Sequence, residues 1–445
     1  MTQALSTLAD RVSGAMLRPG DEGYEEARRV FNAMIDARPA AIVRCSSADD
    51  VVAVVRHAAE KGRELAVRGG AHSVPGFGTA DGAIVADLSP LQTIEVDDAA
   101  RTATAGAGTT WGRFDDITAA HGLATTGGLV STTGIAGLTL GGGIGHLARG
   151  MGLTCDNLVS AHVVTAAGEQ LTASEDENPD LFWALRGGGG NFGVVTEFTY
   201  RLHPLGQVLG GPLFFAMADA PALLAHFRDV MREAPRGYGA FPAFQIGPPL
   251  PFIPEDRVGE TLFAIVSCWT GPVEEGLRLI DGFRQVAPPV AEMIGQMPYP
   301  ALNGAFDGLA PAGLQQYWKT AYLTDLPDEA IAVHMEHGPR VPTVNCSMHI
   351  YPIDGAVHDV PSDATAFGHR DANYLVNIIG AWADPADNER NIAWVRNYRD
   401  ALVPYTQAGG YTNFAAGDEQ DKVADNYGAN YRRLTEVSGA LVFRD

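Results

Sequence analysis

Glycine gathers in one stretch of the chain, residues 127–145, and this stretch limits the possible folds more than any other. Apolar residues such as Leu129, Ile135 and Leu140 separate its glycines, whereas a flexible linker would be polar and low in complexity. A glycine backbone carries no side chain that would keep a ligand away from it. We therefore expect residues 127–145 to form a buried backbone that passes close to a large, flat ligand.

A shorter glycine turn, RGGAHS at residues 68–73, follows a brief apolar run. Its glycines permit positive φ and expose backbone N–H groups, and Arg68 adds a planar cation suited to phosphate. His72 lies near the end of the turn, where a cofactor phosphate or ring could rest against the backbone. The alternative interpretation is a tight turn with a surface histidine. A third dense glycine cluster, GGGGNFG, occupies residues 187–193.

The charge of the chain restricts its partners. With a net charge of −22 over 445 residues, the protein would repel the phosphates of nucleic acids and the surface of an anionic membrane. We expect a small-molecule substrate, with neither nucleic acid nor membrane as partner. Residues 1–18 lack the charged start and long apolar middle of a signal peptide, and no stretch reaches the roughly 20 apolar residues of a membrane span. We therefore expect a cytoplasmic protein.

The order of strand-like and helix-like segments indicates an α+β protein with more than one domain. Residues 40–205 alternate short strands with helices, among them a helix over 51–61 with an N-cap in the polar residues at Ser47. After residue 206, strands and helices follow the pattern of an antiparallel sheet covered by helices. After residue 405 the composition turns aromatic and rich in asparagine. The expected parts are residues 1–206, 207–404 and 405–445.

Other nucleotide and metal motifs are incomplete in this sequence. Gly106-x-Gly108 lacks the third glycine of a Rossmann fingerprint, and Gly143-x-Gly145 is followed by Ala148 but does not stand in a convincing βαβ unit. No glycine cluster carries the Gly-Lys-Ser/Thr of a P-loop. The four cysteines are scattered, without CxxC or Cys/His spacing, so we expect neither a disulfide framework nor a metal site.

Several segments occur in an order that resembles the FAD-linked oxidases of the vanillyl-alcohol oxidase / p-cresol methylhydroxylase superfamily. The resemblance is greatest to the berberine bridge enzyme-like and 6-hydroxynicotine oxidase-like group, and it spans most of the chain. It implies a two-part FAD-binding domain, residues 1–206 and 405–445, and a central substrate domain, residues 207–404, that covers the isoalloxazine. The matching segments are RGGAHS (68–73), GLTLGGGIG (137–145), GLTCDN (152–157), DLFWALRG (180–187), GNFGVVT (190–196) and YGANY (427–431).

The resemblance implies that residues of these segments and of the C-terminal region hold FAD. The implied cofactor-binding positions are Arg68, Gly69, Gly70, Ala71, His72, Ser73, Thr132, Thr133, Gly134, Gly137, Gly142, Gly143, Gly145, Asp156, Asn157, Gly193, Val194, Val195, Tyr411, Asn413, Tyr427 and Asn430.

His72 matches the histidine that carries a covalent 8α bond to the flavin in the family. A neutral imidazole nitrogen is a nucleophile, and the glycines before His72 would let the flavin approach. Many relatives have a second, cysteinyl link, but Val130 stands at that place and valine cannot form a thioether. We therefore expect FAD to be attached through His72 only, with Cys155 as a small packing residue.

The resemblance also implies that a substrate carbon gives a hydride to the flavin, which commonly returns its electrons to oxygen as peroxide. Tyr411 and Asn413 resemble the family's Tyr-x-Asn site, so Tyr411 is a candidate base; the alternative is a buried tyrosine with a satisfied hydroxyl. Residues 355–359 are expected to form a strand where relatives carry an acidic base. Because strand side chains alternate, only one of His358 and Asp359 could face the cavity, and we favour Asp359, although a surface position is an equal alternative.

Substrate contacts are expected from the central domain, with Tyr317, His349 and Tyr374 as candidates and a core position as the alternative. The missing second flavin link favours a smaller substrate than an oligosaccharide. The leading hypothesis is an FAD-dependent oxidase of bacterial secondary metabolism that acts on a small alcohol, amine or phenolic natural product and reduces oxygen. The alternatives are a flavoprotein that catalyses a non-redox or internal-redox cyclisation or isomerisation, and a dehydrogenase with another electron acceptor.

Overall fold

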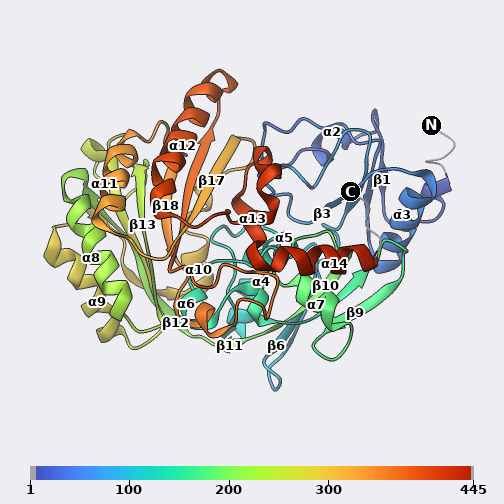
Figure 1. Ribbon diagram of the computed structural model, residues 1–445, viewed down its shortest axis with the longest axis horizontal. Coiled ribbons are helices and arrows are strands. Elements are labelled where there is room, and N and C mark those ends of the chain that lie inside the picture. The colour runs from blue at the N-terminus through green and yellow to red at the C-terminus, as the bar shows by residue number, and fades with distance from the viewer. Residues whose placement is uncertain (1–6, 442–445) are drawn as a thin grey trace.

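The structure is a computed structural model that describes residues 7–441, and it has a mixed α+β architecture. The N-terminal half forms two sheets with short helices, and the central region forms a large antiparallel sheet with longer helices (Figure 1). The C-terminal helices return to the N-terminal half (Figure 1). The expected α+β class is confirmed.

The N-terminal part contains a four-stranded and a five-stranded sheet. The first has the order β1 (Met16–Leu17), β2 (Ala41–Arg44), β4 (Ile84–Asp87), β3 (Leu65–Arg68), and its last three strands are parallel. The second is antiparallel, in the order β5 (Ile94–Asp97), β6 (Thr102–Gly106), β10 (Val194–Arg201), β8 (Leu158–Val164), β9 (Gln170–Ser174). A small pair joins β7 (Leu123–Ala124) to β11 (His203–Pro204).

Helices connect these strands, and α3, α4, α5 and α7 contribute to one hydrophobic core. The helices are α2 (Tyr24–Ala27), α3 (Ala48–Lys61), α4 (Trp111–Ala120), α5 (Ile135–Leu140), α6 (Ala148–Met151) and α7 (Pro179–Leu185). Helix α3 begins at Ala48, before the predicted range of 51–61, because Ser47 is the N-cap and its side chain accepts a hydrogen bond from the Asp50 N–H. It ends at Gly62 in the left-handed conformation that favours glycine.

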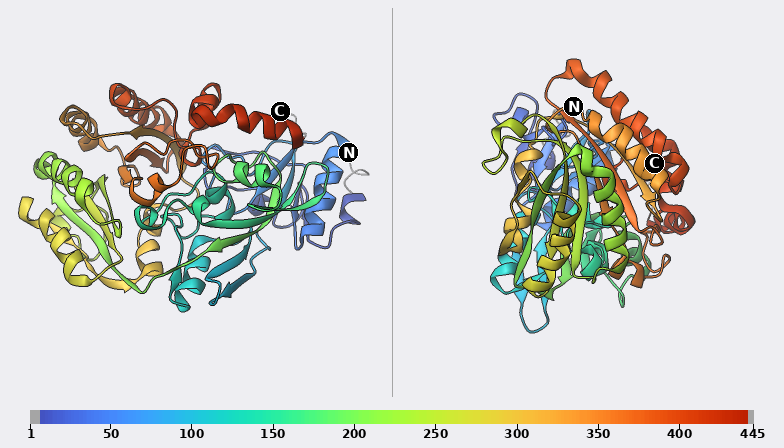
Figure 2. Two further views of the ribbon diagram at one scale, coloured as in Figure 1. Left: turned by 60° about the horizontal axis from the view of Figure 1, so that its bottom comes forward. Right: turned by 90° about the vertical axis from the view of Figure 1, so that its left-hand side faces the viewer.

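The central region is an eight-stranded antiparallel sheet covered by helices. Its order is β15 (Ala291–Glu292), β12 (Gln207–Ala216), β14 (Thr261–Trp269), β13 (Tyr238–Ile246), β18 (Ser347–Pro352), β19 (Tyr374–Trp382), β17 (Gln315–Leu323), with β16 (Gly295–Pro298) on β12. Figures 1 and 2 show the helices on the outer side of this sheet, away from the N-terminal part. These helices are α8 (Ala220–Glu233), α9 (Val273–Val286), α11 (Asp328–His337) and α12 (Asn388–Leu402), while α10 (Tyr299–Asn303) packs on α4.

The C-terminal segment returns to the N-terminal core. It contains α13 (Val423–Tyr427) and α14 (Tyr431–Leu441), and α14 packs against α7 (Figure 1). Leu434 and Val437 join the same hydrophobic cluster as the N-terminal strands. This packing supports the proposed division into residues 1–206 with 405–445 and a central domain, 207–404. Within residues 7–441, none of the helices has both the length and the apolar character needed to cross a membrane.

Candidate active site

A cavity of ≈ 470 Å³ is bounded by both parts of the protein. The glycine turn at 68–73, the segment between residues 128 and 144 and the cluster at 188–193 line one side of it. Strands β13, β14, β18 and β19 line the other side, and residues 412–414 of the C-terminal segment complete it. The three glycine clusters of the sequence therefore meet at one site, which has the size of a small-molecule pocket.

Two of the glycine turns cross in direct backbone contact. A Cβ atom on Gly70 would lie 2.2 Å from the Gly134 nitrogen, and a Cβ atom on Gly134 would lie 2.4 Å from the Gly70 nitrogen. Only glycine fits at both positions. The next residue, Ala71, has a φ of 57°, a left-handed conformation that costs a residue other than glycine about 1–2 kcal/mol. The crossing brings His72 next to Thr132 and Thr133.

The His72 ring is held at the cavity wall on three sides. It stacks on Phe31 with ring centroids 4.3 Å apart, and its Nε2 lies 2.9 Å from Thr132 Oγ1. Its Nδ1 lies 3.4 Å from Thr133 Oγ1. Burial lowers the pKa of His72 to about 4, so the imidazole is neutral in neutral solution and keeps a nucleophilic lone pair.

The glycine wall fits a flat cofactor such as FAD. A Cβ atom on Gly137 or Gly190 would meet no atom within 4 Å, yet both residues line the cavity, so bare backbone faces open space there. Arg68 also lines the cavity, where its guanidinium donates to the Ala27 carbonyl. His72, Arg68 and these two backbones are the groups that could hold the cofactor. Val130 stands in the same wall.

The predicted cofactor positions divide into those that line the cavity and those that do not. The lining ones are Arg68, Gly69, Gly70, Ala71, His72, Ser73, Thr133, Gly134, Gly137, Gly193, Val195, Asn413 and Tyr427. The others are Thr132, Gly142, Gly143, Gly145, Asp156, Asn157, Val194, Tyr411 and Asn430.

Several residues of the second group support the wall by packing or hydrogen bonding. A Cβ atom on Gly143 would lie 2.2 Å from Thr154 Oγ1, and one on Gly145 would lie 1.9 Å from the Gly127 oxygen. Asn430 donates through Nδ2 to the Ser362 oxygen at 2.7 Å. These residue types are required by protein contacts, so a sequence pattern alone does not separate them from ligand contacts.

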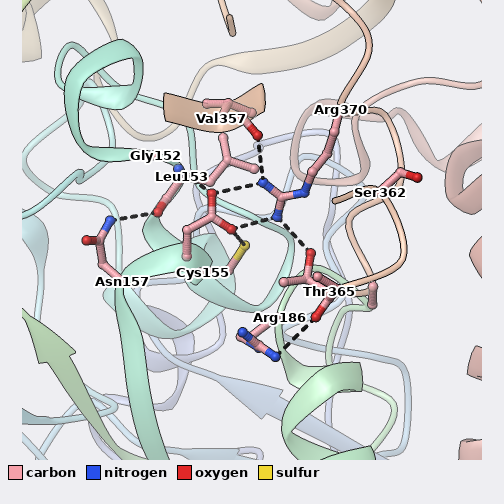
Figure 3. Close-up of polar contacts among 12 residues, drawn as sticks. Gly152, Leu153, Cys155, Asn157, Arg186, Val357, Ser362, Thr365 and Arg370 are labelled. Atoms are coloured by element: carbon pink, nitrogen blue, oxygen red, sulfur yellow. Dashed lines mark hydrogen bonds and ion pairs between the residues drawn. The ribbon is translucent and has the colours of Figure 1, made fainter. Parts of the chain in front are cut away.

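Asp156 and Asn157 fasten the N-terminal part and do not line the cavity. The guanidinium of Arg370 donates to Asp156 Oδ1 at 2.6 Å and to Oδ2 at 3.0 Å, and it also donates to Thr365 Oγ1 at 2.7 Å. Asn157 donates through Nδ2 to the Leu153 oxygen at 2.9 Å. The Asp156–Arg370 pair is almost fully buried and joins residues 152–157 to the central region, from which Arg370 and Thr365 are labelled in Figure 3.

Tyr411 is a buried residue that does not line the cavity. Its hydroxyl accepts hydrogen bonds from the Gly143 N–H at 2.8 Å and from Asn413 Nδ2 at 2.9 Å. Burial raises its pKa well above the ordinary value, so the side chain is a neutral phenol. This geometry favours the alternative stated for it from the sequence: Tyr411 is a positioning residue that ties the glycine segment to the C-terminal region.

His358 and Asp359 lie outside the cavity, and the strand expected for them is wrong. Residues Gly355–Asp359 form a 3-10 helix that begins at Gly355 with a φ of 68°. Asp359 is exposed and makes a two-point ion pair with Arg236, while His358 Nε2 contacts the Ala372 oxygen at 2.9 Å. Without a strand, alternation does not turn either side chain towards the cavity. Asp359 is therefore not positioned to act as a base.

Of the three expected substrate contacts, only His349 lines the cavity. Tyr317 lies on the helix-covered face of β17, where its hydroxyl donates to Asp418 Oδ2 at 2.8 Å. Tyr374 packs in the same helix-covered core. His349 Nδ1 lies 2.5 Å from the Tyr351 hydroxyl, and both residues face the cavity.

Sequence reasoning missed several polar residues of the cavity, among them Gln245, Ser347 and Asn377 on the sheet side. Gln245 and Asn377 each stand in a strand whose other side chains, except for Tyr hydroxyls, are apolar. A lone amide in an apolar strand indicates a binding or hydrogen-bonding role, because a buried amide needs a partner. The sequence does not show which face of the strand borders a cavity, so it could not predict that these amides face the ligand site.

Comparison with known proteins gives the family. Residues 39–174 match the FAD binding domain family. An FAD-linked oxidoreductase of Dictyostelium discoideum is 30% identical over 444 residues, covering 98% of this chain and 93% of that protein. The structure of 6-hydroxy-D-nicotine oxidase from Arthrobacter nicotinovorans superposes with a TM-score of 0.86 at 27% identity, covering 97% of this chain and 95% of the other.

A further solved structure has the same fold at lower identity. It is the glucooligosaccharide oxidase of Acremonium strictum, named with a 6-S-cysteinyl, 8α-N1-histidyl FAD, with a TM-score of 0.86, 21% identity and coverage of 99% and 96%. The chain belongs to the FAD-linked oxidoreductases of the vanillyl-alcohol oxidase / p-cresol methylhydroxylase superfamily. It is an enzyme of the FAD-linked oxidoreductase class.

Proposed function

We propose that this enzyme is an FAD-dependent oxidase that acts on a small alcohol, amine or phenolic compound. One observation carries the proposal: a single cavity has a neutral histidine and bare glycine backbone on one side and a sheet face with a few polar side chains on the other. The similarity to 6-hydroxy-D-nicotine oxidase, which is named as an oxidase, supports it.

We propose that FAD is attached covalently through His72 alone. The neutral ring, the contacts to Thr132 and Thr133 and the strained Ala71 before it support this assignment, because they hold a nucleophile at the cavity wall. Val130 lines the cavity but offers no sulfur for a second bond. Bound FAD supplies a hydride acceptor, and we propose that its electrons then pass to oxygen and give hydrogen peroxide.

The residues of the sheet would bind the substrate and handle its proton. His349 is held through Nδ1 by the Tyr351 hydroxyl, which leaves Nε2 for the cavity. With the proton on Nδ1, Nε2 is an acceptor that can take a hydroxyl or amine proton from the substrate. The proposed role of Tyr351 is to fix this ring through its hydroxyl, and Asn377 stands opposite His349 on the neighbouring strand. Aromatic residues such as Phe241 and Trp318 exclude water.

Substrate screening read by bleaching of the flavin tests the proposal. An oxidase substrate should bleach the yellow band without oxygen, and air should restore the band and release peroxide. Bleaching without rapid return in air would instead indicate a dehydrogenase with another acceptor. Conversion of a substrate with no bleaching at any stage would indicate a non-redox or internal-redox reaction.

A further inference from the structure

The inner face of the central sheet carries a compact polar patch, which consists of Gln245, Ser347, His349 and Asn377. The strand register pairs Gln245 with Ser347 and His349 with Asn377 across β13, β18 and β19. Residues two apart along a strand share a face, so these side chains lie on the same side of the sheet. All four line the cavity.

Two atoms of the polar patch are buried and have no hydrogen-bond partner among the described residues: Nε2 of Gln245 and Oδ1 of Asn377. Gln245 is 8% exposed and Asn377 is 1% exposed. Buried polar atoms are normally paired, and an unpaired one at a cavity wall is satisfied when a ligand supplies the partner. One atom belongs to a donor group and the other is an acceptor, so the polar patch matches a ligand that offers both kinds of group.

The cavity around the polar patch lacks balancing charges. Among the described residues that line it, none is Asp, Glu or Lys, and Arg68 in the opposite, glycine wall is the one with a permanent charge. Lys319 of β17 belongs to the helix-covered face and pairs with Asp418 at 2.8 Å. An ammonium or carboxylate that leaves water for this site would therefore lose hydration without gaining an ion-pair partner.

His349 does not supply a charge either. Burial lowers its pKa to about 3, because the protonated ring would have to leave water. The imidazole therefore remains neutral in neutral solution.

We propose that the polar patch selects an electrically neutral substrate with a hydroxyl or carbonyl group and rejects ammonium and carboxylate groups. The inference rests on the proposed function. Of the alcohol, amine and phenolic substrates proposed there, it favours the alcohol or phenol. In the oxidation of an alcohol, the C–H hydrogen leaves with its electron pair as a hydride for FAD and the C–O bond becomes a carbonyl. The protonated carbonyl that forms in this step is a strong acid, so its O–H proton passes through His349 Nε2 to water although the pKa of that ring is low. Gln245 then donates to the oxygen of both the alcohol and the carbonyl.

Three ligands of nearly the same shape test the charge preference: benzamide, benzamidinium and benzoate. Titration calorimetry with the flavin-loaded enzyme at pH 8 measures their dissociation constants without any turnover. We expect benzamide to bind at least about tenfold more tightly than either ion, because only the ions must be desolvated without a counter-charge. Equal or tighter binding of either ion, or no binding of benzamide, overturns the proposal.

Substitutions locate the preference in the polar patch. Gln245→Leu and Asn377→Leu should each weaken benzamide binding by about tenfold, the cost of one lost hydrogen bond. Gln315→Leu is the matched control, since Gln315 is a buried glutamine of the same sheet that does not line the cavity, and it should leave binding unchanged. Gln245→Glu keeps the side-chain shape, adds a carboxylate and should reverse the preference in favour of benzamidinium. An unchanged order of affinities in folded Gln245→Glu enzyme overturns the proposal.

The binding experiment is independent of the proposed oxidase activity. Benzamide carries no oxidisable alcohol, so its affinity reports on the polar patch even if the enzyme uses no oxygen. Conversely, rapid anaerobic bleaching by a charged amine would refute the neutral-substrate proposal and leave the oxidase proposal intact.

Discussion

Replacement of Asp156 by asparagine tests the contact between residues 152–157 and the central region. The carboxylate of Asp156 and the guanidinium of Arg370 are 6% and 3% exposed and form a two-point ion pair. Asp156→Asn keeps the side-chain volume but leaves the Arg370 charge buried without a counter-charge. Breaking a buried pair in this way costs about 3–5 kcal/mol of unfolding free energy.

The expected change in melting temperature follows from the size of the chain. An unfolding entropy of about 2.1 cal/mol/K per residue amounts to about 0.9 kcal/mol/K for the 445 residues. A loss of about 3–5 kcal/mol therefore lowers the melting temperature by about 3–5 °C. Thermal unfolding, monitored by the increase in flavin fluorescence, measures this shift in melting temperature.

Asp359→Asn is the matched control for Asp156→Asn, because Asp359 makes a similar two-point pair with Arg236 on the surface. Both partners are more than half exposed and remain hydrated when the pair is broken, so the melting temperature should stay within about 1 °C. The double variant Asp156→Asn, Arg370→Gln removes the uncompensated charge and should recover part of the loss. The reasoning fails if Asp156→Asn and Asp359→Asn shift the melting temperature equally.

Four further substitutions test the proposed roles of single residues. His72→Ala should leave the flavin in the supernatant after acid precipitation, whereas the wild-type pellet should stay yellow; a yellow pellet from the variant refutes attachment through His72. Tyr351→Phe removes the partner of His349 Nδ1 and should slow anaerobic flavin reduction by about tenfold or more. An unchanged rate would contradict the proposed role of His349 as proton acceptor. Tyr411→Phe leaves two N–H donors without an acceptor and should cost about 1–3 kcal/mol of stability, with flavin reduction slowed only a few-fold. A rate loss of about a hundredfold without destabilisation would identify Tyr411 as the base after all. Burial lowers the pKa of His146 in the folded protein to about 4. As the pH falls from about 6.5 to 4, the unfolded chain binds a proton at this histidine and the folded protein does not, so the unfolding free energy decreases. The loss amounts to about 2 kcal/mol at pH 5, and His146→Gln should reduce the drop in melting temperature between pH 7 and pH 5 by about 2 °C.

The part of the site that depends on steric limits could be predicted from the sequence. Gly70 and Gly134 must be glycine because two backbones cross there, and such a demand leaves a visible pattern in any chain with this turn. Helix α3 was predictable for a similar reason, since its cap and its periodicity are local. The same limit explains why some predicted cofactor positions do not line the cavity: Gly143 and Asp156 belong to the predicted motifs, but the contacts that the structure gives them are with other parts of the protein.

The roles of the central residues depend on contacts that no local pattern contains. Asp359 was assigned to a strand by its place in the chain, but the turn at Gly355 starts a 3-10 helix and carries the carboxylate to the surface. Gln245 and Asn377 become neighbours of one cavity only because β13, β18 and β19 pair in a register that spans more than 130 residues of sequence. Pairing partners at that separation cannot be read from a single sequence.

The two sides of the cavity are therefore open to change to different degrees. On the glycine side the backbone itself forms the wall, and a side chain at Gly70 or Gly134 would push the crossing turns apart and displace His72. On the sheet side the strands are held by backbone hydrogen bonds, so side chains such as Gln245 and Asn377 can be exchanged while the strands stay in place. A change of substrate requires substitutions only on the sheet side. The uncharged, polar character of those side chains is then the feature from which the substrate of this enzyme is to be inferred. The glycine pattern does not identify the substrate.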